Sequence, residues 1–234
     1  MNLPDAALLA GGLATRLGPL TKEIPKAMLD IGGRPFIDWQ LERLAAQAVQ
    51  KVVLCLGHMG SAIQAHVGDG ARFGLKVDYA FDGPVALGTG GALKQALSKL
   101  GDPFFVLYAD SWLDQAWAPV WQRYRAGDCE SVMTVLRNQG RWGSSNVFYD
   151  HGRVQAYSKN SPSVDFQHID YGLNLFSHAA FARLPESKFD LGKLQATLAR
   201  AGVLAGFEVT ERFYEIGSPA GLAETRQHLT GRSQ

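Results

Sequence analysis

Residues 6–29 read AALLAGGLATRLGPLTKEIPKAML, and this stretch decides how the rest of the chain is interpreted. It opens with five apolar residues, which is typical of a buried strand. The strand runs into Gly11 and Gly12, and two successive glycines let a backbone turn at positive φ and bring its N–H groups close to an anion. Arg16 and Lys26 place a cation at each end of the loop. The stretch therefore predicts a phosphate-binding turn, although it is neither a Walker A motif nor a GxGxxG fingerprint.

The first half of the chain alternates apolar runs with helical patterns. The apolar runs predict strands at residues 6–10, 51–56, 75–81 and 103–109. Apolar residues at helical spacing predict helices at residues 36–48, 59–67 and 89–100. This order requires right-handed crossovers and a sheet with helices on both faces, with the ligand at the carboxyl ends of the strands.

The second half is richer in strands. Further strands are predicted at residues 131–137, 146–149, 153–157 and 171–176, with a hairpin turn at residues 150–152. Further helices are predicted at residues 179–184, 189–201 and 219–229. No repeat or linker divides the chain, so we expect one α/β domain over residues 1–234. Residues 1–110 form a Rossmann-like, doubly wound, mostly parallel part of a mixed sheet, and residues 111–234 form a β-rich extension.

The composition of the chain limits which classes of protein it can belong to. The chain has 234 residues, of which 46% are hydrophobic and 19% charged, and this excludes a disordered or collagenous chain. The net charge of +1 creates no overall field for nucleic acid or an anionic membrane. No apolar run approaches ~18 residues and no basic leader precedes an apolar segment. We expect a cytoplasmic protein without nucleic-acid or membrane partners.

Two residue types admit structural explanations. Cys55 and Cys129 have no CxxC or histidine neighbours, so neither a disulfide nor a zinc site is expected, and Cys55 is interpreted as a small buried hydrophobe. Trp117 and Trp121 lie four positions apart, which predicts packing on one helix face. The alternative is an exposed patch between copies of the chain, so a homo-oligomer stays open.

Residues 9–29, LAGGLATRLGPLTKEIPKAML, resemble the signature of sugar-1-phosphate nucleotidylyltransferases, roughly GGxGTRLxPLTxxxPKxM. The resemblance continues through GRPFIDWQLERL, VGDGARFGLKVDY, LGTGGALKQAL and, near the C-terminus, YEIGSP, so it covers almost the whole chain. The LGTGGAL string and the short length are most similar to bacterial heptose-1-phosphate and muramic-acid-1-phosphate enzymes.

The resemblance implies an enzyme that moves a nucleoside monophosphate from an NTP to a sugar 1-phosphate with release of pyrophosphate. Its partners are those two substrates, and its cofactor is Mg²⁺. We expect GTP with heptose or mannose 1-phosphate first, and uridylyl, cytidylyl and thymidylyl transfer remain open. The product would supply an activated sugar for cell-surface glycan.

The resemblance also assigns the nucleotide site. Arg16 is expected on the triphosphate and Lys26 near the α-phosphate, both as catalytic residues. The nucleotide-binding residues are expected to be Leu9, Ala10, Gly11, Gly12, Leu13, Thr15, Gly88 and Thr89. Gly88, Gly90 and Gly91 are expected to permit close approach of a flat ligand, whereas Thr89 can instead be the N-cap of the following helix.

Two carboxylates are candidate metal ligands. Asp110 ends an apolar strand where the family typically has Gly-Asp, and Mg²⁺ takes one or two carboxylates together with phosphate oxygens. The alternative for Asp110 is an N-cap or turn residue. Glu215 stands where the family has Asp, and it is interpreted either as the second ligand or as a surface glutamate.

Sugar-phosphate recognition is expected in the β-rich half. Where the family has Glu-Lys, the chain has Ser158 and Lys159, so the phosphate-binding lysine is retained and a carboxylate that often grips sugar hydroxyls is missing. The resemblance brings in Asn146, Asp170 and Gly172 as further sugar-phosphate residues, each with a purely structural alternative.

Two rival classes remain. Ser158 and Glu215 are compatible with a non-catalytic sugar-nucleotide-binding protein, which would bind nucleotide without releasing pyrophosphate. A glycosyltransferase usually carries a DxD motif, and the Asp110–Ser111–Trp112 sequence does not fit it.

Overall fold

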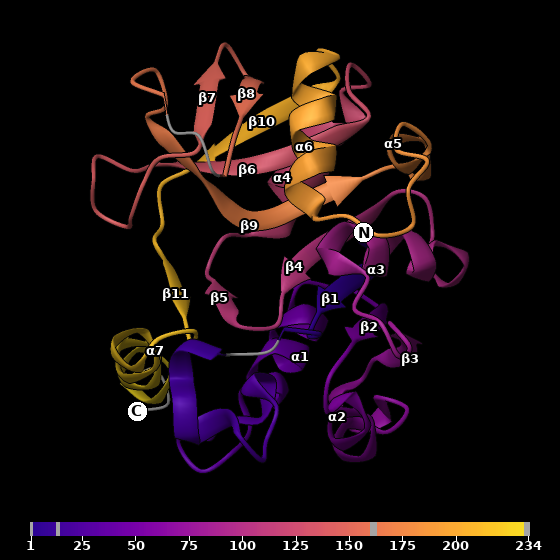
Figure 1. Ribbon diagram of the computed structural model, residues 1–234, viewed down its shortest axis with the longest axis vertical. Helices are drawn as coiled ribbons and strands as arrows, with labels where there is room; N and C mark the ends of the chain where they lie inside the picture. Colours follow the sequence, from indigo (N-terminus) through magenta and orange to yellow (C-terminus); the bar gives the residue numbers. More distant parts are fainter. Residues whose placement is uncertain (1, 13–14, 160–162, 232–234) are drawn as a thin grey trace.

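The computed structural model describes residues 2–12, 15–159 and 163–231, without the side chains of Thr15 and Arg16, and within these residues a nine-stranded mixed sheet forms the core of the protein (Figure 1). The strands are β1 (Ala6–Leu9), β2 (Lys51–Leu56), β3 (Lys76–Phe81), β4 (Phe104–Tyr108), β5 (Ser111–Leu113), β6 (Ser131–Arg137), β7 (Val147–Asp150), β8 (Arg153–Tyr157), β9 (His168–Phe176), β10 (Leu204–Val209) and β11 (Phe213–Glu215). The α-helices are α1 (Phe36–Ala46), α2 (Gly60–Val67), α3 (Gly88–Ala96), α4 (Trp117–Arg125), α5 (His178–Ala182), α6 (Leu191–Arg200) and α7 (Pro219–Gly231). Short 3₁₀ helices are η1 (Thr15–Thr21), η2 (Lys26–Met28), η3 (Ala71–Phe73) and η4 (Leu97–Lys99).

The strand order of the large sheet is β3-β2-β1-β4-β9-β6-β10-β8-β7. Strands β1 to β4 pair in parallel, and β9 joins them to the second half by pairing antiparallel with both β4 and β6. In β1, Leu9 is in register with Cys55 of β2 and Tyr108 of β4. The carboxyl ends of these three strands therefore meet at one edge of the sheet.

Alternate residues of β1 point to opposite faces, as the period of a strand requires. Ala6 and Leu8 belong to a core cluster that includes residues of α1, α2 and α4, whereas Ala7 and Leu9 belong to another that includes residues of α3, α5 and α6. All four residues are buried, so this strand is covered on both faces as expected for a doubly wound fold.

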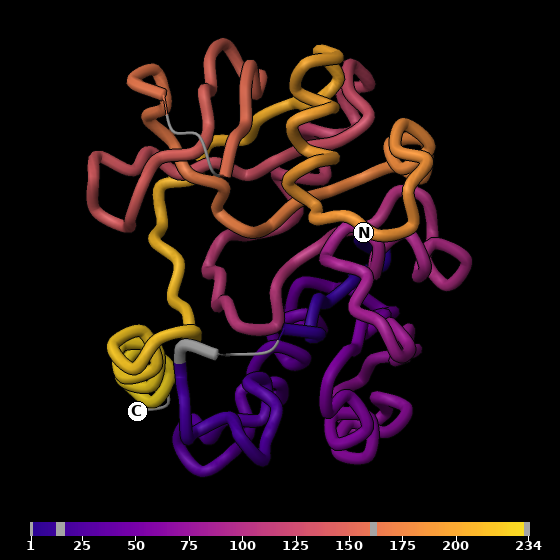
Figure 2. Tube along the Cα trace, viewed as in Figure 1, coloured from indigo at the N-terminus to yellow at the C-terminus, as the bar shows by residue number. Residues whose placement is uncertain are grey.

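A third apolar cluster fixes the C-terminal segment against the N-terminal half. It joins Leu17 and Phe36 to Trp112 of β5, Ile216 and Leu222 of α7. Strand β11 pairs antiparallel with β5 in a separate two-stranded sheet. Figure 2 shows the yellow C-terminal segment crossing from the second half to end beside the indigo N-terminal part. This crossing brings Glu215 next to the segment that follows β4.

Most predicted elements are confirmed. The four strands and three helices of the first half lie within a few residues of their predicted bounds, and the hairpin between β7 and β8 turns at His151 and Gly152. Both turn residues have positive φ, as a type I′ turn requires. Strands β5, β10 and β11 were not predicted, and β9 begins at His168, earlier than expected.

The prediction that Gly11 and Gly12 turn at positive φ is wrong, because neither adopts a left-handed φ. Gly11 instead packs closely against the backbone of Gly57, where an added Cβ would lie 3.2 Å from the Gly57 amide nitrogen. Gly90 and Gly91 are likewise not needed by a flat ligand: both are buried in α3, and a Cβ on either would overlap the segment at Ser187 and Phe189.

The structural interpretations of Cys55 and Trp117 are confirmed. Cys55 is 1% exposed, and burial, together with the charge of Asp82, raises the pKa of its thiol to about 12. Trp117 is 1% exposed and its ring packs 4.7 Å from that of Phe105, while Trp121 packs partly buried against the same core cluster. Among the helices that the structure describes, none has the length and apolar character to cross a membrane.

Candidate active site

A cavity of about 420 Å³ opens at the carboxyl ends of β1, β2 and β4. Its lining consists of Leu9, Ala10, Gly11, Gly12, Lys26, Ala27, Cys55, Asp82, Ala86, Gly88, Thr89, Ala92, Tyr108, Ala109, Asp110 and Asp190. Small ligands bind in clefts of this size and at this position in open α/β sheets. We call it the first cavity, and it contains eight of the predicted site residues.

Three predicted nucleotide-site residues cannot be placed in the same way. Leu13 lies outside the described residues. Thr15 and Arg16 begin η1, but their side chains also lie outside the description. Their contacts with a triphosphate stay predictions from the sequence.

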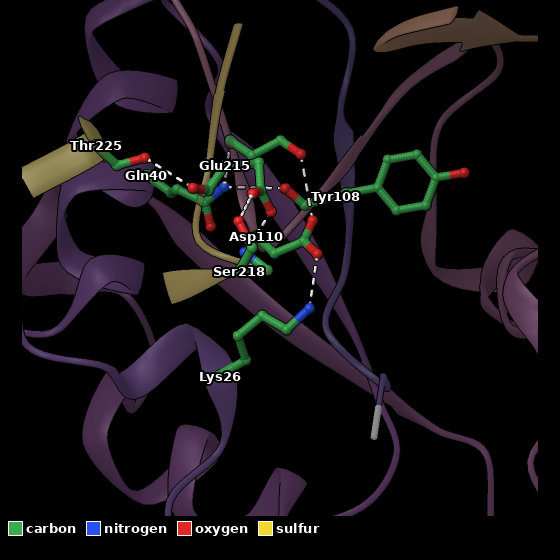
Figure 3. Close-up of polar contacts among 9 residues, drawn as sticks. Lys26, Gln40, Tyr108, Asp110, Glu215, Ser218 and Thr225 are labelled. Carbon is green, nitrogen blue, oxygen red and sulfur yellow. Dashed lines mark hydrogen bonds and ion pairs between the residues drawn. The ribbon is translucent and has the colours of Figure 1, made fainter. Parts of the chain in front are cut away.

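Lys26 and Asp110 form an ion pair at the edge of the first cavity (Figure 3). The ammonium Nζ of Lys26 lies 2.9 Å from Oδ2 of Asp110, and the two side chains are 15% and 29% exposed. Lys26 begins η2 directly after Pro25, whose fixed φ suits the start of a helix. A lysine and a carboxylate 84 positions apart thus meet at the same point, where a phosphate can bind the first and a cation the second.

Besides the ion pair with Lys26, two further contacts hold Asp110. The hydroxyl of Ser111 donates to Oδ1 at 3.2 Å, and the amide of Ile216 donates to the Asp110 carbonyl at 2.9 Å. Strand β5 begins at Ser111, so Asp110 is not a helix N-cap, but the turn alternative is confirmed because Ala109 and Asp110 form a turn between β4 and β5. The carboxylate faces Lys26 and the cavity from this turn.

Gln40 of α1 also shapes this site, and sequence reasoning missed it. Its side chain is 2% exposed, and Nε2 donates to the carbonyls of Tyr108 at 3.0 Å and Ser111 at 2.9 Å (Figure 3). One amide therefore clamps the backbone on both sides of Asp110. The helical spacing of α1 predicted its apolar face but gave no sign that a buried glutamine lies on it.

Glu215 is not a solvated surface residue. Its Oε2 accepts from the amide of Gly217 at 2.5 Å, and its Oε1 accepts from the hydroxyl of Ser218 at 2.6 Å. A Cβ on Gly221 would overlap the same carboxylate, so α7 packs closely around it. Glu215 thereby ties β11 to the start of α7, and together with Asp110 it lines a second cavity.

The donor set fits a Mg²⁺ ion. Asp110 and Glu215 supply hard carboxylate oxygens on one cavity, and each carboxylate has about four lone-pair sites, so the hydrogen bonds described above leave room for a ligand bond. Within the described residues, no three or more His, Cys, Asp and Glu side chains converge as a metal site. A cation here would take these two carboxylates together with substrate phosphates, which is how proteins commonly hold Mg²⁺.

Asp82 lies on the first cavity and was not singled out from the sequence. It follows β3 as Asp110 follows β4, and its Oδ2 accepts from the amide of Leu87 at 3.2 Å. Burial raises the pKa of its carboxyl group, and the Leu87 amide offsets part of that rise. The sequence feature that could have identified Asp82 is its position directly after a predicted strand.

Thr89 is not the N-cap of its own helix, because α3 begins at Gly88. Its hydroxyl accepts from the amide of Leu191 at 2.8 Å, in the first turn of α6. Gly88 has a φ of 75°, and a Cβ there would lie 2.7 Å from the carbonyl of Phe189. Both residues line the first cavity while holding α3 against α6.

Three of the four predicted sugar-phosphate residues, Asn146, Asp170 and Gly172, come together at the start of β9. Oδ1 of Asn146 accepts from the amide of Asp170 at 2.9 Å, and Asp170 accepts from the amide of Gly172 at 3.0 Å and from Gln195 at 2.8 Å. Burial raises the pKa of Asp170, and the positive charge of Lys159 offsets part of that rise. Asn146 and Asp170 thus have structural roles, and no contact in the described part of the chain tests a role in sugar binding.

The second cavity, of about 590 Å³, meets the first at Asp110. Its lining includes Arg141, Trp142, Arg212, Phe213, Glu215 and Glu224. Asp110 is common to both linings, so it lies where the contents of the two cavities would meet. The loop at residues 138–145 and the start of α7 form its sides.

Comparison with known proteins identifies the family of the chain. The sequence profile described as nucleotidyl transferase matches residues 5–143, which is more than half of the chain. The chain is 28% identical over 224 residues to N-acetylmuramate alpha-1-phosphate uridylyltransferase of Caulobacter vibrioides, and the match covers 92% of each protein. It is 29% identical to mannose-1-phosphate guanylyltransferase of Mycobacterium tuberculosis, over 79% of this chain and 52% of that protein. The chain thus spans about half the length of the mycobacterial relative.

Among solved structures, HddC from Yersinia pseudotuberculosis complexed with GMP-PN is similar, with a TM-score of 0.80 and 26% sequence identity. The similarity covers 97% of this chain and 100% of that chain. The whole fold, including the C-terminal crossing, therefore has a counterpart of the same extent.

Proposed function

The chain belongs to the nucleotidyl transferase family, and from that premise we propose that it transfers a nucleoside monophosphate from an NTP to a sugar 1-phosphate. One observation carries the proposal. Lys26 and Asp110 meet at the end of a nucleotide-sized cavity, at the carboxyl ends of the sheet's parallel strands. The relatives named above act on sugar 1-phosphates, which supports that acceptor.

The reaction is one displacement at phosphorus. A phosphate oxygen of the sugar 1-phosphate bonds to the α-phosphorus, and the bond from that phosphorus to the bridging oxygen of the β-phosphate breaks. Pyrophosphate leaves with the electron pair of the broken bond, and no proton transfer is required. Because attacking and leaving oxygens lie in line, the protein's task is to align two anions and stabilise the charge between them.

The chain's residues divide this task along the first cavity. Lys26 would approach the α-phosphate and the backbone at Gly11 and Gly12 would face the nucleotide. The sequence motif assigns Arg16 to the triphosphate. A Cβ added to Gly12 would meet no described atom within 4 Å, so a phosphate can approach its backbone. Asp110 and Glu215 would hold Mg²⁺, which supplies positive charge between the reacting phosphates when it is bound.

Asp82 favours GTP as the donor. The Watson–Crick edge of guanine presents N1–H and N2–H₂ side by side, and a carboxylate accepts both in one bidentate contact. Uracil presents a single N3–H between two carbonyl acceptors, which repel a carboxylate. Asp82 lines the first cavity directly after β3, whereas Lys26 comes from η2 and Asp110 follows β4.

We propose heptose or mannose 1-phosphate as the acceptor, with Lys159, Asn146, Asp170 and Gly172 on the sugar side. Because the proposed donor is a nucleoside triphosphate, which the cytoplasm supplies, we propose that the reaction takes place in the cytoplasm. Its product, a nucleoside diphosphate sugar, would supply cell-surface glycan synthesis. A uridylyl transferase acting on a muramic acid 1-phosphate is the alternative, because the relative from Caulobacter carries that name and matches over most of its length.

The experiment measures pyrophosphate release by the purified protein with Mg²⁺, each of four NTPs, and mannose, glucose, heptose and N-acetylmuramate 1-phosphates. We expect release with GTP and one of these sugars, and no release without the sugar. Nucleotide binding without pyrophosphate release for any pair would favour a non-catalytic sugar-nucleotide-binding protein.

A further inference from the structure

We propose that His228 of α7 and Asp114, the residue after β5, form a latch that sets the position of Glu215. The inference rests on the proposed function in one respect, which is that Glu215 is assigned to Mg²⁺. It names two positioning residues that the sequence motifs did not identify. The apolar contacts of α7 hold the helix on the protein, and the latch fixes where the helix lies relative to β11.

The latch is a hydrogen-bonded pair whose two side chains are largely buried. Nε2 of His228 lies 2.8 Å from Oδ2 of Asp114, and the side chains are 18% and 14% exposed. The indole Nε1 of Trp112 donates to Oδ1 of the same carboxylate at 2.9 Å. An ionised carboxylate only accepts, so His228 donates through Nε2. Because little water reaches this pair, its hydrogen bond is stronger than an exposed one, and it weakens when the partners move apart.

The latch contacts both strands of the two-stranded sheet. Trp112 lies in β5 and is in register with Tyr214 of β11. The ring of Tyr214 stacks on that of His228, with 3.8 Å between the ring centres and 15° between the ring planes. Tyr214 directly precedes Glu215, which is in register with Ser111 of β5. The position of His228 is therefore tied to the backbone that carries Glu215.

Helix α7 connects the latch to Glu215. The hydroxyl of Thr225, which is fully buried, donates to the Glu215 carbonyl at 2.9 Å (Figure 3). The hydroxyl of Ser218, just before the helix, donates to Oε1 of Glu215 at 2.6 Å. His228 follows Thr225 by three residues, so the two side chains lie on the same face of α7. A shift of α7 that broke the latch would thus also displace the groups that hold Glu215.

The remaining contacts of the C-terminal segment define its position less closely. The segment packs into the third apolar cluster, which is smaller than the two clusters on the faces of the large sheet. Apolar burial has no preferred direction, whereas a hydrogen bond has a preferred distance and angle. The ion pair between Arg212 and Glu224 is exposed, so water screens it. Loss of the latch should therefore loosen the alignment of α7 without releasing the helix.

The test replaces His228 in the full chain with phenylalanine and, separately, with glutamine. His228→Phe keeps a ring that can stack on Tyr214 but has no donor for Asp114, whereas His228→Gln keeps a donor. His66→Phe is the matched control, because Nε2 of His66 in α2 lies 2.7 Å from the carboxylate of Asp38, which is 12% exposed. The control thus removes an equivalent contact from another helix.

Asp114→Asn tests the other partner of the latch. An asparagine offers one acceptor oxygen where the carboxylate offers two, so either Trp112 or His228 loses its acceptor. This variant is judged by the same measurements, and it takes the place of His228→Phe if that protein does not fold.

The first measurement is the Mg²⁺ concentration that gives the half-maximal rate of pyrophosphate release. Replacing a residue that orients a metal ligand typically weakens metal affinity 10–100-fold. We expect His228→Phe and Asp114→Asn to raise this concentration about tenfold, and we expect His228→Gln and His66→Phe to leave it near that of the unmodified protein.

The second measurement needs neither metal nor substrate. It is the hydrogen-exchange rate of the Gly217 amide, followed by NMR, because this amide donates to Oε2 of Glu215. We expect faster exchange in His228→Phe than in His66→Phe, with equal exchange rates for the amides of β1 in the two proteins. Both measurements must change for the inference to stand.

The outcomes separate this inference from the proposed function. If the unmodified protein turns over and His228→Phe matches His66→Phe in either measurement, the latch does not position Glu215, although the function stands. If the unmodified protein releases no pyrophosphate with any substrate pair, the proposed function fails. The exchange rate of the Gly217 amide then decides alone: faster exchange in His228→Phe than in His66→Phe supports the latch, and equal rates overturn it.

Discussion

Replacing Gln40 with methionine tests whether the backbone around Asp110 must be held in place for the reaction. Methionine has nearly the same shape but no donor, so the change removes both hydrogen bonds from Nε2 to the carbonyls of Tyr108 and Ser111. The site is 2% exposed, so water does not readily replace the lost donor.

The magnitude follows from counting the polar groups. Two carbonyls lose a partner, which costs about 1–3 kcal/mol for each buried group. The Oε1 atom of Gln40 is buried and has no hydrogen-bond partner in the described structure, so its removal offsets about the cost of one such group. We therefore expect the free energy of unfolding to fall by about 1–3 kcal/mol, which is a moderate loss for a core position.

The effect on activity should exceed the effect on stability, because a shift of about 1 Å in a reacting group costs on the order of 100-fold in rate. The assay measures kcat and the Mg²⁺ concentration that gives half-maximal rate, alongside urea unfolding. Thr134→Val is the control, since it removes a buried hydrogen bond to the carbonyl of Leu173 in another part of the sheet. A Gln40→Met protein that is destabilised like the control but keeps the normal kcat and Mg²⁺ dependence would refute the positioning role.

Three further perturbations test other parts of the site. Lys26→Met should lower kcat by about 10²–10³, as loss of one transition-state contact does. The control is Lys22→Met, at an exposed lysine of the same segment, which should leave kcat unchanged. Equal rates in the two variants would show that Lys26 takes no part in the reaction. Burial raises the pKa of Asp82, so the KM for GTP should rise as pH falls through that pKa and the carboxylate is protonated. Asp82→Asn should abolish this dependence in a profile of KM against pH. The same slope in both proteins would exclude Asp82 from base recognition. Burial also raises the pKa of Asp170 above its ordinary 3.8, so its contribution to stability is fully present below that value and is lost as pH rises through the raised pKa. Unfolding free energies of Asp170→Asn across pH should lack this decline, and parallel curves for the two proteins would contradict the assignment.

The sequence alone predicted the strands that have an apolar or alternating local pattern, and it missed strands that depend on distant partners. Strand β10 contains Gly206, which weakens a strand by its local preference. The glycine is required because a Cβ there would overlap the ring of Tyr149, from β7. Strands β5 and β11 have three residues each, and they form because Phe213 pairs with Leu113 across a long stretch of chain. Neither contact can be recognised from the local sequence pattern.

The same distinction between local and distant contacts applies to the residues of the site. Lys26 and Asp110, both singled out from the sequence, line the first cavity. Each follows a local signal: a proline before a short helix for Lys26 and the end of an apolar strand for Asp110. Residues whose importance lies in what they touch were missed. Gln40 matters through two backbone carbonyls, and the second cavity depends on the pairing of β11 in the C-terminal segment with β5.

Glu215 shows why a substitution within a motif has to be judged from its surroundings. The longer side chain replaces the family's aspartate, but Gly221 leaves the space that its carboxylate occupies, and Gly217 and Ser218 donate to both of its oxygens. Shortening the side chain by one methylene in Glu215→Asp would withdraw the carboxylate from at least one of these donors while keeping its charge on the cavity. The lost hydrogen bond should lower stability by about 1–2 kcal/mol. If Glu215 is a metal ligand, the same change should also shift the Mg²⁺ concentration for half-maximal rate, whereas a purely structural residue would lower the melting temperature and leave that concentration unchanged.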